Sequence, residues 1–96
     1  SIIIINPIFN TINSNRFKKL DVTNFNQLDT LRASNNLLTS VDVSTLTELD
    51  YLDVSVNKLR KLDVSKNSKL DRLFASRNQL SAINVSNNPP VGSRNV

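Results

Sequence analysis

A few aromatic and arginine side chains stand where the surrounding sequence pattern does not require them. The chain of 96 residues has only one Tyr and four Phe. Tyr51 and Phe74 both occupy positions that the pattern described below turns away from the core. Aromatic and arginine residues are concentrated at the centres of protein interfaces. We therefore predict a protein- or peptide-binding patch, with scattered surface residues as the alternative. Its members are Tyr51, Phe74, Arg32, Arg72, Arg77 and Asp53.

The composition gives little support to catalysis. Without His or Cys, the chain lacks a histidine base, a Cys-His pair and the usual ligands of zinc. Its single Gly excludes a Gly-rich phosphate loop. Asp50, Asp53 and Asp71 could lie close enough for acid–base work, but an open sheet face does not desolvate such carboxylates. The sequence therefore predicts that the protein is not an enzyme and has no cofactor.

A row of acidic residues recurs in the chain as Asp21, Asp42 and Asp63, and Asn84 continues it. A metal ion needs oxygen ligands that converge on one point, and a flat row seldom provides them. We expect these side chains to bond to local backbone groups or to meet neighbouring lysines. The sequence predicts no metal site here.

Basic residues form two clusters in a chain with a net charge of +4 and a pI near 9.9. A track of this kind can bind phosphates. However, the intervening stretch carries Leu37, Thr39 and Ser40, so the basic stripe is interrupted. We therefore expect a solvated face and no nucleic-acid partner. The clusters are Arg16, Lys18 and Lys19, and then Lys58, Arg60, Lys61, Lys66 and Lys69.

These side chains are set within a repeat of 21 residues. Leu-x-x-Leu-x-(Ala/Val), an Asn, Leu-x-x-(Val/Leu/Ile) and (Asp/Asn)-(Val/Ile)-Ser recur in the same order in residues 28–48, 49–69 and 70–90. Residues 7–27 form a degraded repeat that keeps Leu20 and Val22 but lacks the two leading leucines. There, a slip of one residue that uses Ile8 instead stays open. Such a period indicates coils stacked on one another.

Each repeat predicts one short strand and a second extended segment on the opposite wall. In the strand, Leu52 and Val54 point inward at period two, and the residues between them point outward. Twenty-one residues leave no room for a full helix. Two outward rows follow from the period: Thr30, Tyr51 and Arg72, and then Arg32, Asp53 and Phe74. Phe9 and Thr11 would extend them into the degraded repeat.

One asparagine recurs in every full repeat, as Asn36, Asn57 and Asn78. A row of amides could bind a ligand. The stronger hypothesis is an internal structural ladder, because a tight coil leaves inward-facing N–H and C=O groups that cost about 1–3 kcal/mol each if unsatisfied. Asn carries a donor and an acceptor on a short stem and can satisfy both.

The two ends of the chain are expected to differ from the repeats. Four consecutive isoleucines within residues 1–6 predict a strand, which Pro7 ends because it has no N–H. It is either a first strand or cap, or the edge of a longer array, able to pair with another chain. We expect residues 91–96 to be a frayed tail. No apolar run reaches the roughly 20 residues of a membrane helix, so no membrane insertion is predicted.

This combination of leucines, asparagine and Asp-Val-Ser resembles a leucine-rich repeat, and its 21-residue period resembles bacterial internalin-type (internalin J-like) surface proteins. The resemblance covers residues 12–89. It implies a leucine-rich-repeat solenoid with a short parallel sheet on its concave face, extended or turn segments on its convex side and little or no helix. It also implies binding of a protein or peptide on the concave face, and an extracellular or cell-surface location. The alternative function is a structural element that self-associates through its ends.

Overall fold

The computed structural model describes residues 2–4, 18–84 and 93–95. Within these ranges every regular element is a strand of three residues, and no helix is present. None of the described residues belongs to a helix long and apolar enough to cross a bilayer. The strands are β1 (Ile2–Ile4), β2 (Thr30–Arg32), β3 (Tyr51–Asp53), β4 (Lys61–Asp63), β5 (Arg72–Phe74), β6 (Ala82–Asn84) and β7 (Ser93–Asn95).

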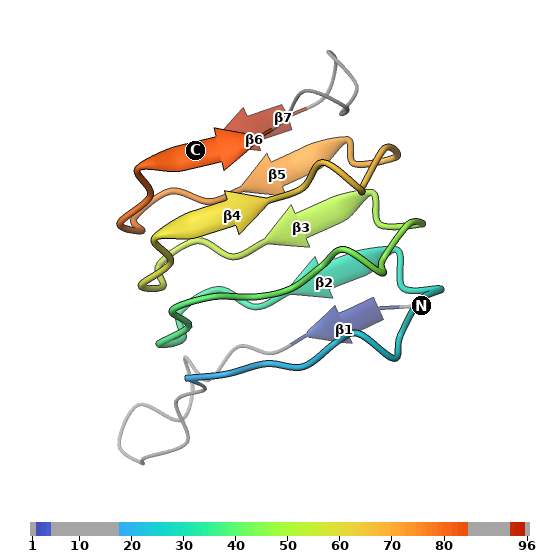
Figure 1. The fold of residues 1–96 in the computed structure, drawn as a ribbon, viewed down its shortest axis with the longest axis horizontal. Helices are drawn as coiled ribbons and strands as arrows, with labels where there is room; N and C mark the ends of the chain where they lie inside the picture. The colour runs from blue at the N-terminus through green and yellow to red at the C-terminus, as the bar shows by residue number, and fades with distance from the viewer. Residues whose placement is uncertain (1, 5–17, 85–92, 96) are drawn as a thin grey trace.

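The strands form two parallel sheets that make the two walls of a stack of flattened coils (Figure 1). The larger sheet has the order β1-β2-β3-β5-β7, and β4 pairs with β6 in the second sheet. Leu31, Leu52 and Leu73 are paired in register across β2, β3 and β5. The 21-residue period predicts this pairing, and each coil therefore lies directly on the one before it.

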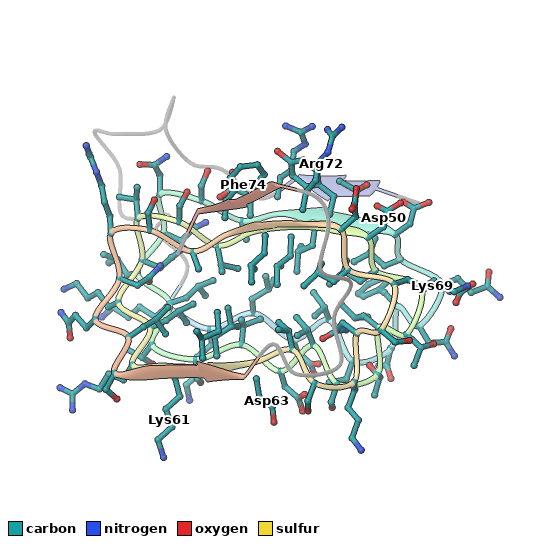
Figure 2. The ribbon with its side chains drawn as sticks, turned by 90° about the horizontal axis from the view of Figure 1, so that it is seen from above. Asp50, Lys61, Asp63, Lys69, Arg72 and Phe74 are labelled. Carbon is teal, nitrogen blue, oxygen red and sulfur yellow. The ribbon has the colours of Figure 1, made fainter. Side chains whose placement is uncertain are left out.

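Aliphatic side chains fill the space between the two walls (Figure 2). Leu31, Leu52 and Leu73 are at most 1% exposed. The turn adds Leu38 and Leu59, both fully buried. Burying one such side chain contributes about 1.5–3 kcal/mol, and no coil could bury its apolar side alone. The core thus depends on stacking, which also fixes the residues that face outward.

The first strand lies in a register that the period does not predict. A shift of 21 residues would place Phe9 beside Thr30, whereas the structure pairs Ile2 with Thr30, 28 residues earlier in the chain. The run of β-branched isoleucines favours an extended strand, and residues 7–27 lack the two leading leucines of a full repeat. Phe9 and Thr11 lie outside the described residues. In the described part of this segment, Val22 is 1% exposed.

The expectation of a frayed tail at residues 91–96 is wrong for the part that the structure describes. Ser93–Asn95 forms β7, which runs parallel to β5 and pairs Ser93 with Arg72. This pairing keeps the spacing of 21 residues. Backbone pairing requires no particular side chain, so β7 extends the sheet without the leucine pattern that marks the other strands.

Candidate partner-binding surface

The outward side chains of β2, β3 and β5 lie in two rows across the middle of the larger sheet. Tyr51 is paired with Thr30 on one side and Arg72 on the other. Two residues further along, Asp53 is paired with Arg32 and Phe74. Within each strand the central leucine is buried while its neighbours are at least partly exposed. The rows therefore agree with those expected from the period.

Tyr51 links the two rows through contacts with Arg32 and Phe74. The Tyr51 and Phe74 ring centroids are 5.5 Å apart with an angle of 46° between the planes. Arg32 Cζ lies 4.6 Å from the centroid of the Tyr51 ring. A tilted aromatic pair and a cation–π contact are both attractive arrangements. These three side chains, with Arg72 beside Tyr51, are called the strand surface below.

Burial differs among the members of the strand surface. Tyr51 and Phe74 are half-buried, whereas Arg32 and Arg72 are exposed. Figure 2 shows Arg72 and Phe74 on the outer side of the sheet, away from the aliphatic core. The rings are thus partly covered by each other and by the Arg32 guanidinium, and they still offer apolar area to a partner.

Asp53 has an internal role that the sequence analysis did not predict. Its Oδ1 accepts hydrogen bonds from Ser55 N at 3.1 Å and from Ser55 Oγ at 2.6 Å. A short polar side chain bonded to the backbone two residues ahead stabilises a local turn. Asp53 therefore stabilises the turn that follows β3, and its Oδ1 is already hydrogen-bonded to Ser55.

The structure does not bring Arg77 into the strand surface. Arg77 lies beyond the end of β5, where its backbone has a φ of 56°. The same place in the preceding coils is taken by Val56, with a φ of 55°, and Asn35, with a φ of 59°. This left-handed row was not predicted. Asn35 was the available signal, because Asn tolerates this conformation better than most residues.

A second row of aspartates, Asp29, Asp50 and Asp71, lies immediately before strands β2, β3 and β5. Asp50 N donates to Asp29 O, and Asp71 N donates to Asp50 O, both at 2.9 Å. Asp50 and Asp71, together with Thr30, Tyr51 and Arg72, line a shallow hollow of about 300 Å³. Of the three carboxylates considered for acid–base work, Asp50 and Asp71 therefore share this hollow, while Asp53 is bonded to Ser55. The hollow places carboxylates beside the strand surface.

The recurring asparagines lie inside the coils. Asn57 Nδ2 donates to Val54 O at 2.9 Å in its own coil and to Ala33 O at 3.0 Å in the coil below. Its Oδ1 accepts from Leu38 N at 3.1 Å. Asn78 repeats the pattern one coil further, where its Oδ1 accepts from Leu59 N at 2.9 Å. These amides are thus engaged with backbone groups in two adjacent coils.

The aspartates of the other row bond to the residue two positions ahead. Asp42 Oδ1 accepts from Ser44 N at 3.0 Å and from Ser44 Oγ at 2.6 Å. The hydrogen bond from the Ser44 hydroxyl is the largest cause that lowers the pKa of Asp42 below its ordinary value, and the bond from the Ser44 amide is the next largest. Asp21 and Asp63 have lowered pKa values for the same reasons, from Thr23 and Ser65 respectively. These carboxylates stabilise the turns after each outer segment.

Comparison with known proteins finds no relative: no family model, no curated protein and no solved structure matches the chain. The function must therefore be inferred from the geometry of its surfaces.

Proposed function

We propose that the chain is a leucine-rich-repeat solenoid that binds a protein or peptide on its strand surface. The regular register, the alternation of buried and outward residues and the second extended wall support the solenoid. Its resemblance to leucine-rich repeats, carried by the leucines and by Asn36, Asn57 and Asn78, supports the class. The binding function then depends on which outward side chains of β2, β3 and β5 are available to a ligand.

The contact of Arg32, Tyr51 and Phe74 is the observation that supports binding most strongly. The core is complete without these rings, because the inward residues of the same strands are fully buried. Tyr and Arg are also the residues that most often dominate the binding energy of interfaces. Because these three side chains already contact one another, they would lose little further conformational freedom when a partner binds.

The strand surface fits a ligand that combines an apolar side chain with charged groups. A ligand side chain placed against Tyr51 and Phe74 would gain about 25 cal/mol for each Å² of apolar area buried. Arg32 and Arg72 would attract carboxylates of the ligand. Asp50 and Asp71, in the adjacent hollow, would attract its cations. Contacts of this kind are made by side chains, because the paired strands β2, β3 and β5 have no free edge.

The experiment that tests this proposal is a peptide selection. A displayed library of random peptides is selected on the immobilised protein, and the enriched peptides are measured by fluorescence anisotropy. We expect the double variant Tyr51→Ala/Phe74→Ala to bind them at least ~30-fold more weakly, the loss of about 2 kcal/mol typical of one hot spot. Circular dichroism checks that the variant stays folded.

Phe25→Ala supplies the matched control, because Phe25 is 50% exposed and lies outside the strands. This variant should bind the selected peptides with unchanged affinity. Retained affinity in the double variant, or an equal loss in Phe25→Ala, would refute binding at the strand surface.

A second candidate function is assembly through the ends of the stack. The sheet order places β1 and β7 at the two edges of the larger sheet, and an edge strand is a template for pairing with another chain. Light scattering distinguishes this alternative. Growth of the particles with concentration would favour assembly, whereas a constant monomer mass would contradict it.

A further inference from the structure

A second hollow lies at the opposite edge of the coils, where the chain turns from the larger sheet toward the second wall. Its volume is about 320 Å³, and most of its surface is apolar. It spans three successive coils, because its residues belong to the turns 18–19, 37–39 and 58. The lining residues, called the turn-edge site below, are Lys18, Lys19, Leu37, Thr39 and Lys58.

Positive charge dominates the turn-edge site. Lys18, Lys19 and Lys58 are exposed, and none of them forms a salt bridge within the described part of the chain. Residues 37–41 and 58–62 contain no Asp or Glu, and Arg60 and Lys61 add further positive charge. The nearest carboxylate after Lys18 and Lys19 is Asp21, which accepts hydrogen bonds from Thr23. Like charges gathered without counter-charges create a local potential that attracts anions.

Leu37 gives this basic site an apolar floor. It lies next to Leu38, the core residue of the turn, and it is only partly buried. One and two repeats later, the same place is taken by Lys58 and Gln79, so the fold does not need an apolar residue there. An inorganic phosphate would gain nothing from Leu37. A nucleic acid would be expected to use aromatic stacking, and none of the described residues that line the hollow is aromatic.

The spacing of the coils defines the ligand further. Adjacent parallel strands are about 4.8 Å apart, so the coils of Lys18 and Lys58 are separated by roughly 10 Å. In an extended peptide the side chains two residues apart share one face, about 6.6 Å from each other. The pattern Glu-x-Leu-x-Glu therefore presents two carboxylates about 13 Å apart with an apolar side chain between them, and the long lysine side chains cover the difference.

From these observations we infer that the turn-edge site binds an acidic segment of a partner protein, in which an apolar residue lies between two carboxylates. The lysines pair with the carboxylates, and Leu37 contacts the apolar residue. This site is separate from the strand surface, so the two could be occupied at the same time.

Titration with a labelled peptide tests the inference. The probe contains Glu-Ser-Leu-Ser-Glu between Gly-Ser flanks, and its binding is followed by fluorescence anisotropy at low ionic strength. We expect Lys18→Glu/Lys58→Glu to weaken binding by at least tenfold and Leu37→Ser by about fivefold. Replacing the Leu of the peptide by Ser should cause a loss similar to that of Leu37→Ser.

Two controls define the result. Lys66→Glu/Lys69→Glu makes the same change of net charge away from the hollow and should alter binding less than twofold. Tyr51→Ala/Phe74→Ala should bind the probe unchanged, which separates this site from the strand surface. Equal weakening by the two charge variants, or no effect of Leu37→Ser, would overturn the inference. Tighter binding of a single-stranded oligonucleotide than of the peptide would also overturn it and indicate a phosphate-binding face.

Discussion

Asn57 shows how one side chain joins two coils. Its amide bonds to Ala33 O in the coil below and to Val54 O in its own coil, and it accepts the N–H of Leu38. At 8% exposure, the side chain has little access to a ligand. The sequence allows an internal ladder to be predicted because Asn recurs at the point where each coil must turn.

Asn57→Ala should therefore destabilise the protein by about 3 kcal/mol or more. The substitution leaves the Leu38 N–H in the interior without its acceptor, which costs about 1–3 kcal/mol. It also removes one of the two amide donors to Ala33 O and one of the two to Val54 O, each worth about 1 kcal/mol. Urea unfolding measures the change. The exposed residue Asn26 provides the control, since Asn26→Ala should shift stability by no more than about 0.5 kcal/mol. Equal unfolding midpoints for the two variants would contradict the ladder.

Val56 is the residue at which local conformation and residue type disagree most. It has a φ of 55°, and a left-handed conformation costs a residue with a Cβ roughly 1–2 kcal/mol. Its amide donates to Ser76 O at 2.9 Å, so the conformation is fixed by pairing with the next coil. A periodic pattern of apolar residues carries no information about such backbone angles, which is why the left-handed row could not be predicted from it.

We expect Val56→Asn to raise the free energy of unfolding by about 1 kcal/mol, because Asn tolerates this conformation and already occupies the equivalent position as Asn35. Little apolar burial is lost, since Val56 is 36% exposed. Thermal unfolding should show an increase of about 4–8 °C for a domain of this size. Thr39→Asn, an exposed change in the neighbouring turn, should give no increase. A lower melting temperature for Val56→Asn would contradict the strain.

Among the structural elements, the Asp-x-Ser turns are those in which a short sequence motif most directly determines the local structure. In each, the carboxylate accepts both the amide and the hydroxyl of the residue two positions ahead, as Asp42 does from Ser44. The same unit closes β3, where Asp53 bonds to Ser55. The repeated Asp-Val-Ser is thus a structural motif of the coil. This explains why its aspartates remain in a row without converging on a point.

The pKa of Asp42 should rise toward the ordinary aspartate value of about 3.9 in Ser44→Ala, because the hydroxyl of Ser44 is the largest cause of its lowering. Carboxyl chemical shifts recorded against pH measure this value, and Asp63 in the same spectra should titrate as before. An unchanged pKa of Asp42 would show that the hydroxyl bond has little effect in solution.

These lowered pKa values also set the direction of the pH dependence. Because the pKa is lower in the folded chain than in the unfolded chain, folding favours the ionised carboxylate. The stabilisation is fully present above the unfolded pKa, near 3.9, and it is lost as the pH falls through the lower folded value. Melting temperatures recorded from pH 5 downward should therefore decrease, and less steeply in Ser44→Ala.

The strands could be predicted to different extents. The period identifies β2, β3 and β5, because leucines mark that wall in every full coil. On the opposite wall it points to Asp-Val-Ser, residues 63–65, whereas β4 is Lys61–Asp63 and Ser65 N bonds back to Asp63 in the turn that follows. The period does not place β1, since the residues before β2 lack the leucines that fix a register. It also misses β7, where backbone pairing with β5 replaces the apolar pattern.

For the whole molecule, stacking turns a one-dimensional repeat into surfaces of different character. Each outward position becomes a row, so Arg32, Tyr51 and Phe74 meet although they are far apart in sequence. The rows could be predicted from the period. The ring contacts could not, because they depend on side-chain rotamers. The role of Arg77, whose row lies beyond the strands at the turn, stays a prediction.

Stacking also gathers a row of aspartates at one edge and a group of lysines at the other, and Lys69 at the first edge is paired with Glu48 at 2.8 Å. Asp29, Asp50 and Asp71 precede the strands at one edge, where Figure 2 shows Asp50 and Lys69. The turn-edge site follows the strands at the other edge. The net charge of +4 does not reveal this distribution of charge over the surface. It can be recognised only when residues one coil apart are placed side by side.

The most direct test of this account is a nuclear Overhauser measurement on the isotopically labelled protein. Stacking in register predicts methyl contacts from Leu52 to both Leu31 and Leu73, together with contacts between the Tyr51 and Phe74 rings. If Leu52 contacts neither leucine, and the two rings show no cross-peak in the folded protein, the stack and the strand surface are both contradicted.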